Sequence, residues 1–94
     1  MTRFEIKKTG IENLFFGHSR PINDSRGFFE RVFCHDEISP YLRSGRFIKQ
    51  INRSLSFQVG TTRGLHFQWP PFAETKIVSC TKGELFDVAV DLRF

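Results

Sequence analysis

One short segment of the sequence gathers side chains that can do acid–base chemistry. Arg63-Gly64-Leu65-His66-Phe67-Gln68 holds a guanidinium, an imidazole and an amide. Imidazole titrates near neutral pH, so His66 could act as a general base toward a weakly acidic carbon. On a strand, His66 and Gln68 would share one face and Arg63 the other, unless Gly64 introduces a bulge. An ordinary half-buried strand histidine remains the alternative interpretation of His66.

Two charged residues farther along could complete such a site. Lys76 follows Glu74 by two positions and could stabilise an oxyanion or a phosphate, although a lone lysine of this kind is more often solvated. Asp87 stands in an apolar strand pattern. If its face is inward, the carboxylate needs a partner, because burying an unpaired charge is costly. Lys76 or His66 could supply that partner, and a solvent-facing strand would need none.

Three further residues are candidates for ligand binding. Arg26 lies in Asp24-Ser25-Arg26-Gly27-Phe28-Phe29, where a guanidinium could fork onto phosphate oxygens while a Phe stacks on a base. Gln50, Asn52 and Ser54 stand at every second position and would share one face of a strand, which suits a polar barrel interior that binds a ligand. Each pattern has a plainer alternative, a decorated surface turn in the first case and an exposed sheet face in the second.

Several other kinds of site are not indicated. His18, His35 and His66 are scattered, and Gln68 stands where a second histidine ligand would alternate with His66, so no metal or other cofactor is predicted. The glycine-rich phosphate loops and the GxSxG nucleophile motif are missing from the sequence. A short, interrupted basic cluster does not make nucleic acid a favoured partner; it comprises Arg43, Arg46, Lys49 and Arg53.

The elements that must position these residues are mostly strands. Phe4–Lys7, Leu14–Phe16 and Phe28–Phe33 are predicted strands, with a turn at Thr9-Gly10 and a loop over 21–27. His35–Arg43 is predicted to be a helix of one or two turns, because Pro40 falls inside it.

The second part of the sequence also shows strand patterns. Residues 46–54 alternate moderately, and Leu65–Gln68 and Ile77–Cys80 are short strand candidates. The clearest alternation runs from Leu85 to Arg93 and is joined to Ile77–Cys80 through a predicted hairpin loop over 81–84. Short strands and twelve phenylalanines favour an all-β antiparallel sandwich or barrel with an aromatic core.

Length and composition set the remaining limits. Ninety-four residues with a net charge of +4 and 39% hydrophobic residues are typical of one small soluble domain over 1–94. The apolar stretches are too short for a signal peptide or a membrane span, so a cytoplasmic protein without membrane contact is expected. Cys34 and Cys80 are expected to be buried, reduced thiols. The best strand pattern coincides with the chain end, which suggests a truncated barrel.

The order of these motifs strongly resembles the N-terminal half of the dTDP-4-dehydrorhamnose 3,5-epimerase family. The two most specific runs are Arg63-Gly64-Leu65-His66-Phe67-Gln68-x-Pro70-Pro71 and Phe86-Asp87-Val88-Ala89-Val90-Asp91-Leu92-Arg93. The resemblance implies a cupin fold, that is, a double-stranded β-helix jelly roll, here truncated and carrying one short helical excursion. It also implies a homodimer and a metal-free epimerisation at C3 and C5 of a dTDP-4-keto-6-deoxyhexose.

The resemblance also implies roles for individual residues. His66 would be the base, Lys76 the cation beside the enolate and Asp87 an active-site carboxylate. The nucleotide-sugar contacts would be Arg26, Gln50, Asn52 and Arg63. A tyrosine in the family's second half would return the proton, and the carboxylate that orients the histidine lies there too, so the fragment alone is expected to be inactive.

One departure from the family pattern stands out. Many members carry a nucleotide-contacting glutamate five residues after the arginine that corresponds to Arg26, whereas this chain has Arg31 there and Glu30 one place earlier. The charge reversal could mean another nucleotide or only an altered contact. A sugar-nucleotide-binding cupin of other specificity, either a 3,4-ketoisomerase or a non-catalytic protein, is therefore the alternative function.

Overall fold

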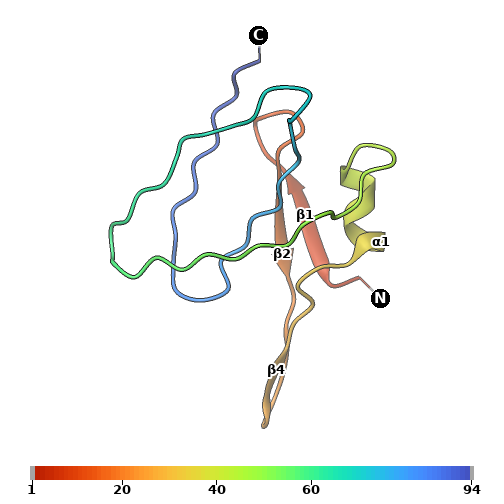
Figure 1. The fold of residues 1–94 in the computed structure, drawn as a ribbon. Coiled ribbons are helices and arrows are strands. Elements are labelled where there is room, and N and C mark those ends of the chain that lie inside the picture. Colours follow the sequence, from red (N-terminus) through yellow and green to blue (C-terminus); the bar gives the residue numbers. More distant parts are fainter. Residues whose placement is uncertain (1, 94) are drawn as a thin grey trace. The chain divides into compact units, whose positions relative to one another are not determined.

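The computed structural model describes residues 2–93, and its regular structure consists of short strands and one short helix (Figure 1). Two compact units are distinguished in it. The first comprises residues 2–47 together with 90–93, and the second comprises residues 48–89. The expectation of strands with one helical excursion is thus confirmed at the level of element types. None of the helices formed by residues 2–93 has the length and apolar character needed to cross a membrane.

The first unit is built on an antiparallel pair of strands, β1 (Phe4–Lys8) and β2 (Phe15–Ser19). Phe4 and Ile6 alternate with exposed positions, as a strand with one covered face requires. Gly17 lies opposite Ile6, and a Cβ at Gly17 would come within 3.2 Å of the Ile6 side chain. The predicted strand over Phe4–Lys7 is confirmed, and the second strand begins one residue later than Leu14.

The turn between these strands is held by Thr9. Its hydroxyl donates to the carbonyl of Leu14 at 2.8 Å and accepts from the amide of Ile11 at 3.1 Å. Asn13 adopts a left-handed conformation with φ of 67°, which asparagine tolerates better than most residues. The turn predicted at Thr9-Gly10 is therefore confirmed as the start of the β1–β2 connection.

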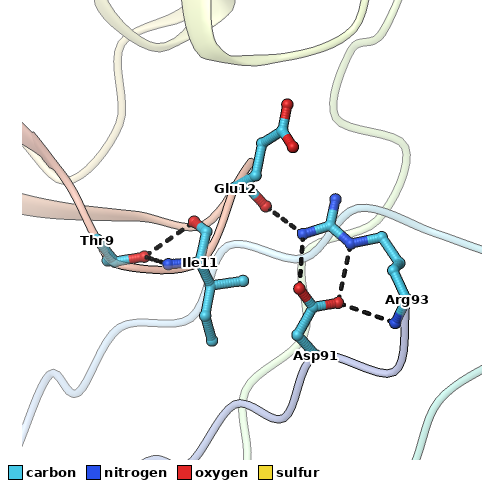
Figure 2. A network of polar contacts seen from close by, with 5 residues as sticks. All are labelled: Thr9, Ile11, Glu12, Asp91 and Arg93. Atoms are coloured by element: carbon cyan, nitrogen blue, oxygen red, sulfur yellow. Dashed lines mark hydrogen bonds and ion pairs between the residues drawn. The ribbon is translucent and has the colours of Figure 1, made fainter.

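Arg93, near the C-terminal end of the first unit, is hydrogen-bonded to the turn between β1 and β2. Figure 2 shows the guanidinium of Arg93 donating to the carbonyl of Glu12 and to the carboxylate of Asp91, with Nε 2.9 Å from Asp91 Oδ1. The amide of Arg93 also donates to Asp91 Oδ1 at 3.0 Å. The side-chain and backbone hydrogen bonds from Arg93 lower the pKa of Asp91 below its ordinary value.

A second hairpin, β3 (Ile22–Asp24) and β4 (Gly27–Phe29), follows directly. The sequence prediction of a loop over 21–27 was wrong for Ile22–Asp24, because the turn needs only Ser25 and Arg26. The predicted strand Phe28–Phe33 was too long. Continuing the register would set Glu30 opposite Pro21, and proline has no amide hydrogen for the ladder.

The helix predicted within His35–Arg43, limited by Pro40 to one or two turns, is confirmed. It consists of α1 (His35–Ile38) and one 3-10 turn, η1 (Ser39–Tyr41). Pro40 lies in η1, where it cannot donate an α-helical hydrogen bond, and Leu42 is already extended. Tyr41 contacts Phe15 edge to face at 5.0 Å, which joins the helical excursion to β2.

The apolar side chains that are partly covered all belong to the first unit. None in residues 2–93 is fully buried, so this is a partial core. Its half-buried apolar members are Phe4, Ile6, Ile11, Leu14, Phe15, Phe33, Ile38 and Leu42.

The carboxylate of Glu37 joins three segments of this unit. Its Oε1 accepts from the amides of Arg3 at 2.6 Å and Phe4 at 3.0 Å, and its Oε2 accepts from Arg31 Nη1 at 2.8 Å. Burial by itself raises the pKa of Glu37, but the hydrogen bonds from Arg31, Phe4 and Arg3 outweigh it and lower the pKa to about 2. We call this arrangement the Glu37 clamp.

The second unit contains no strand within residues 48–89, which the structure describes as turns, bends and irregular chain. The strands predicted over 46–54, Leu65–Gln68, Ile77–Cys80 and Leu85–Arg93, and the hairpin over 81–84, are therefore wrong for this chain. The alternation is present, but a strand also needs a neighbour for its amide and carbonyl groups. The backbone hydrogen bonds of this unit instead close local turns, at Gln58–Thr61 and Trp69–Phe72.

Side-chain exposure also differs between the first and the second unit. Every residue of 48–89 is exposed, including Phe57 at 92% and Phe86 at 93%. Apolar side chains as large as phenylalanine are usually covered by other parts of a protein.

Cys34 and Cys80 are both free thiols, as expected, but Cys80 is exposed and Cys34 only half-buried, so the prediction of burial was wrong.

We expect the isolated 94-residue chain to unfold without a cooperative transition in its second unit, because that unit has neither a strand ladder nor a buried core. Amide hydrogen exchange should be fast throughout 48–89 and slower in β1 and β2. Slow exchange at residues 77–80 and 85–88, together with a single cooperative melting transition, would contradict this expectation.

The Glu37 clamp predicts a specific loss of stability in acid. Because the pKa of Glu37 is lowered to about 2, its contribution is complete above the ordinary glutamate pKa of about 4.3 and is lost as pH falls toward 2. In the complete protein that carries this chain, Glu37→Gln should flatten the fall in Tm between pH 5 and pH 2. Glu5→Gln, in an exposed pair with Lys7 at 3.5 Å, is the matched control and should keep the wild-type slope. Equal slopes in all three proteins would show that the clamp does not form.

Candidate active site

Arg26 is presented at the tip of the β3–β4 hairpin. Its Nη2 lies 2.8 Å from Asp24 Oδ2, and its own amide donates to Asp24 Oδ1 at 2.8 Å. Gly27 has φ of +139°, a conformation that disfavours any side chain there. The sequence pattern Asp-x-Arg-Gly is thus an aspartate that orients the arginine and a glycine that allows the turn.

The charges at this tip are paired, but Arg26 remains accessible to an anionic ligand. Hydrogen bonds from the Arg26 side chain and amide lower the pKa of Asp24, so the pair stays ionised. The Arg26 side chain is nonetheless 88% exposed, which leaves donors available to a ligand. Phe28 and Phe29 line a shallow, open hollow beside it and are themselves exposed, so an apolar ring could stack there.

His66 follows a glycine that its own ring covers. Gly64 has φ of +92°, and a Cβ at that position would come within 3.1 Å of His66 Nδ1. Glycine therefore suits both the backbone conformation and the close approach of the imidazole. A side chain at Gly64 would be strained by this backbone conformation, and the His66 ring would have to shift by a few tenths of an ångström.

Arg63 and the aromatic residues near His66 are held by local contacts. The Arg63 Nη2 donates to the carbonyl of Leu55 at 3.5 Å across the turn at Gln58–Thr61, a long and weak hydrogen bond. Phe67 and Trp69 meet edge to face at 5.1 Å. Both rings are exposed, so they present an aromatic surface in the sequence next to the histidine.

Lys76 is paired with Glu74, whose Oε1 lies 3.8 Å from Lys76 Nζ. Both side chains are about half exposed, which makes the pair weak and exchangeable. Asp87 and the polar residues Gln50 and Asn52 are exposed in irregular chain of the same unit. The pairing of Asp87 with Lys76 or His66, which the sequence left open, is not formed within residues 2–93.

The candidate residues thus fall into two groups. Arg26 belongs to the first unit, and the others belong to the second. The catalytic grouping of His66, Lys76 and Asp87 stays a prediction, as do the ligand contacts of Arg26, Gln50, Asn52 and Arg63. Among residues 2–93, no three His, Cys, Asp or Glu side chains are grouped so as to hold a metal ion.

Comparison with known proteins decides the family. The family model described as dTDP-4-dehydrorhamnose 3,5-epimerase matches residues 8–94. The chain belongs to the dTDP-4-dehydrorhamnose 3,5-epimerase family. The resemblance inferred from the sequence motifs is therefore confirmed.

Individual members of the epimerase family support this assignment. A dTDP-4-dehydrorhamnose 3,5-epimerase of Sinorhizobium fredii is 50% identical over 74 residues, covering 79% of this chain and 37% of the relative. One of Shigella flexneri is 40% identical over 89 residues, covering 94% of this chain and 48% of the relative. One of Methanothermobacter thermautotrophicus is 37% identical over 93 residues, covering 99% of this chain and 49% of the relative. The chain thus spans about half the length of these epimerases or less. No solved structure matches it.

The structure also shows contacts of Glu37 and Arg31 that the sequence did not predict. The sequence pattern gives Glu37 no role, and its partner Arg31 stands out in the sequence only as a departure from the family pattern. An acid in a short helix, six residues after an arginine, was the available signal. It was too weak to identify a clamp without the positions of the Arg3 and Phe4 amides.

We predict that His66, Lys76 and Asp87 converge on one concave face once the second unit is paired into a sheet, because a base and an enolate-stabilising cation must reach the same substrate carbon. A structure of the complete protein with bound dTDP tests this directly. His66 and Lys76 on opposite faces of a sheet would rule out the proposed grouping.

Proposed function

We propose that the complete protein carrying this chain is an isomerase that epimerises C3 and C5 of a dTDP-4-keto-6-deoxyhexose. The observation that supports this most strongly is the family match over residues 8–94, which includes the whole Arg-Gly-Leu-His and Phe-Asp-Val-Ala-Val-Asp-Leu-Arg runs. The relatives' names favour this reaction over the alternative, a 3,4-ketoisomerase or a non-catalytic cupin.

The chemistry required suits the residues present. A proton on a carbon next to a ketone becomes acidic only if the resulting enolate is stabilised, so the site needs a base and a cation or donor at the oxyanion. His66 takes the proton, Lys76 stabilises the enolate oxygen, and Asp87 serves as an active-site carboxylate. An acid on the opposite face, a tyrosine outside this chain, returns a proton and inverts the carbon.

Substrate binding is assigned to the remaining residues. Arg26 and Arg63 bind the diphosphate, since guanidinium groups fork onto phosphate oxygens. Gln50 and Asn52 contribute hydrogen bonds to the nucleotide sugar. This reaction requires neither a metal nor an organic cofactor, because the ketone of the substrate itself activates both carbons.

The same family membership supports a fold for the complete protein. We propose a jelly-roll barrel in which residues 1–94 are one part of a single cupin domain and further polypeptide supplies the neighbouring strands. The exposed apolar side chains of 48–89, such as Phe86 at 93%, are consistent with such cover. A cytoplasmic homodimer is the proposed assembly.

Replacing His66 tests the proposed base. In the complete protein, His66→Ala should lower kcat by about 10²-fold or more, since a positioned general base contributes about 10²–10⁴-fold, while dTDP-sugar binding largely survives. Arg63→Ala should mainly raise KM. His18→Ala, in β2, is the matched control and should leave both constants near wild type.

Solvent deuterium incorporation at C3 and C5 reports the proton abstraction itself. Wild-type protein should exchange both positions, and His66→Ala should lose exchange in parallel with kcat. Normal exchange in His66→Ala would assign the base to another residue.

A further inference from the structure

The guanidinium of Arg31, the residue that departs from the expected family pattern, is bound to Glu37. Its Nη1 lies 2.8 Å from Glu37 Oε2, and the two side chains are 33% and 12% exposed. The hydrogen bond to Glu37 raises the pKa of Arg31 further. This pair is much more enclosed than the Arg26–Asp24 pair at the hairpin tip, whose arginine is 88% exposed.

The Glu37 clamp lies at the base of the β3–β4 hairpin. Before the hairpin, the amide of Arg20 donates to the carbonyl of Arg3 at 2.9 Å. After it, Arg31 is bound to Glu37, whose other oxygen accepts from the amide of Arg3 at 2.6 Å. Both legs of the hairpin are therefore tied to the backbone of Arg3, the residue that precedes β1.

The hairpin has little else to hold its direction. Its ladder pairs three residues with three, and every residue from Ile22 to Phe29 is exposed. A two-stranded hairpin of this size is marginal by itself. The direction in which it carries Arg26 depends on how its two legs are fixed at the base.

We propose that Arg31 is a positioning residue: bound to Glu37, it fixes the base of the β3–β4 hairpin and thereby places Arg26 for binding the nucleotide diphosphate. This rests on the proposed function of Arg26. The arginine at position 31 is then explained by its neighbour, since a glutamate there would set a second carboxylate beside Glu37.

A double-mutant cycle in the complete protein separates positioning from direct contact. Arg31→Ala and Glu37→Ala should each raise KM for the dTDP-4-keto sugar by about tenfold, with kcat nearly unchanged, because a misplaced binding group weakens binding more than proton transfer. The double variant should show no larger effect than either single one, because both changes break the same clamp. Arg31→Lys should restore part of the loss. Lys7→Ala, at the exposed pair with Glu5, is the control expected to keep KM.

These variants distinguish a positioning role of Arg31 from direct contact with the nucleotide. If Arg31 touched the nucleotide directly, Glu37→Ala would leave KM unchanged while Arg31→Ala raised it, and that result would overturn the proposal. Additive effects of the two single changes on KM would also overturn the proposal. Should the alanine variants not fold, Arg31→Gln and Glu37→Gln carry the same cycle.

Calorimetry with dTDP alone keeps this test independent of turnover. The same non-additive pattern is expected in the Kd for dTDP. A wild-type protein that binds dTDP but does not epimerise the sugar would overturn the proposed function and leave the clamp standing. Normal epimerisation with dTDP affinity unaffected by either single variant would overturn the clamp alone.

Discussion

The hydrogen bonds accepted by the carboxylate of Glu37 hold the segments of the first unit together. This carboxylate accepts hydrogen bonds from two consecutive backbone amides, Arg3 and Phe4, and from the guanidinium of Arg31. These donors come from the start of β1 and from the link between β4 and α1. A single acid thus connects elements that have few buried apolar contacts between them, and a neutral side chain could not satisfy the same donors as strongly.

The second unit, in contrast, has no interaction that pairs its segments into a sheet within residues 48–89. Its sequence alternates as strands should, and its glycines and prolines shape local turns, but its chain has no ladder partners and its apolar residues are exposed. Local pattern defines which residues can share a face. Backbone pairing decides whether a sheet forms, and in a jelly roll that pairing joins segments far apart in the chain.

This difference explains what could be predicted. The strands over Phe4–Lys8 and Phe15–Ser19 form because a short turn brings their partners together, and Pro40 shortens the helix as expected. The strand over Leu85–Arg93, the strongest pattern in the sequence, does not form because no nearby segment pairs with it. At the candidate site, Arg26, Gly64 and His66 have local geometry that explains their spacing. Glu37 was missed because its role depends on backbone amides that are distant in sequence.

The Glu37 clamp joins three segments of the first unit at the base of the hairpin that carries Arg26. The most direct test is an NMR titration of the Glu37 side-chain carboxyl in the complete protein. The clamp predicts a pKa of about 2 for Glu37, well below that of an ordinary glutamate, because Arg31 and two amides bind the ionised form. A pKa of about 4.3, the ordinary glutamate value, would mean that the three donors are not in place and that the clamp does not form.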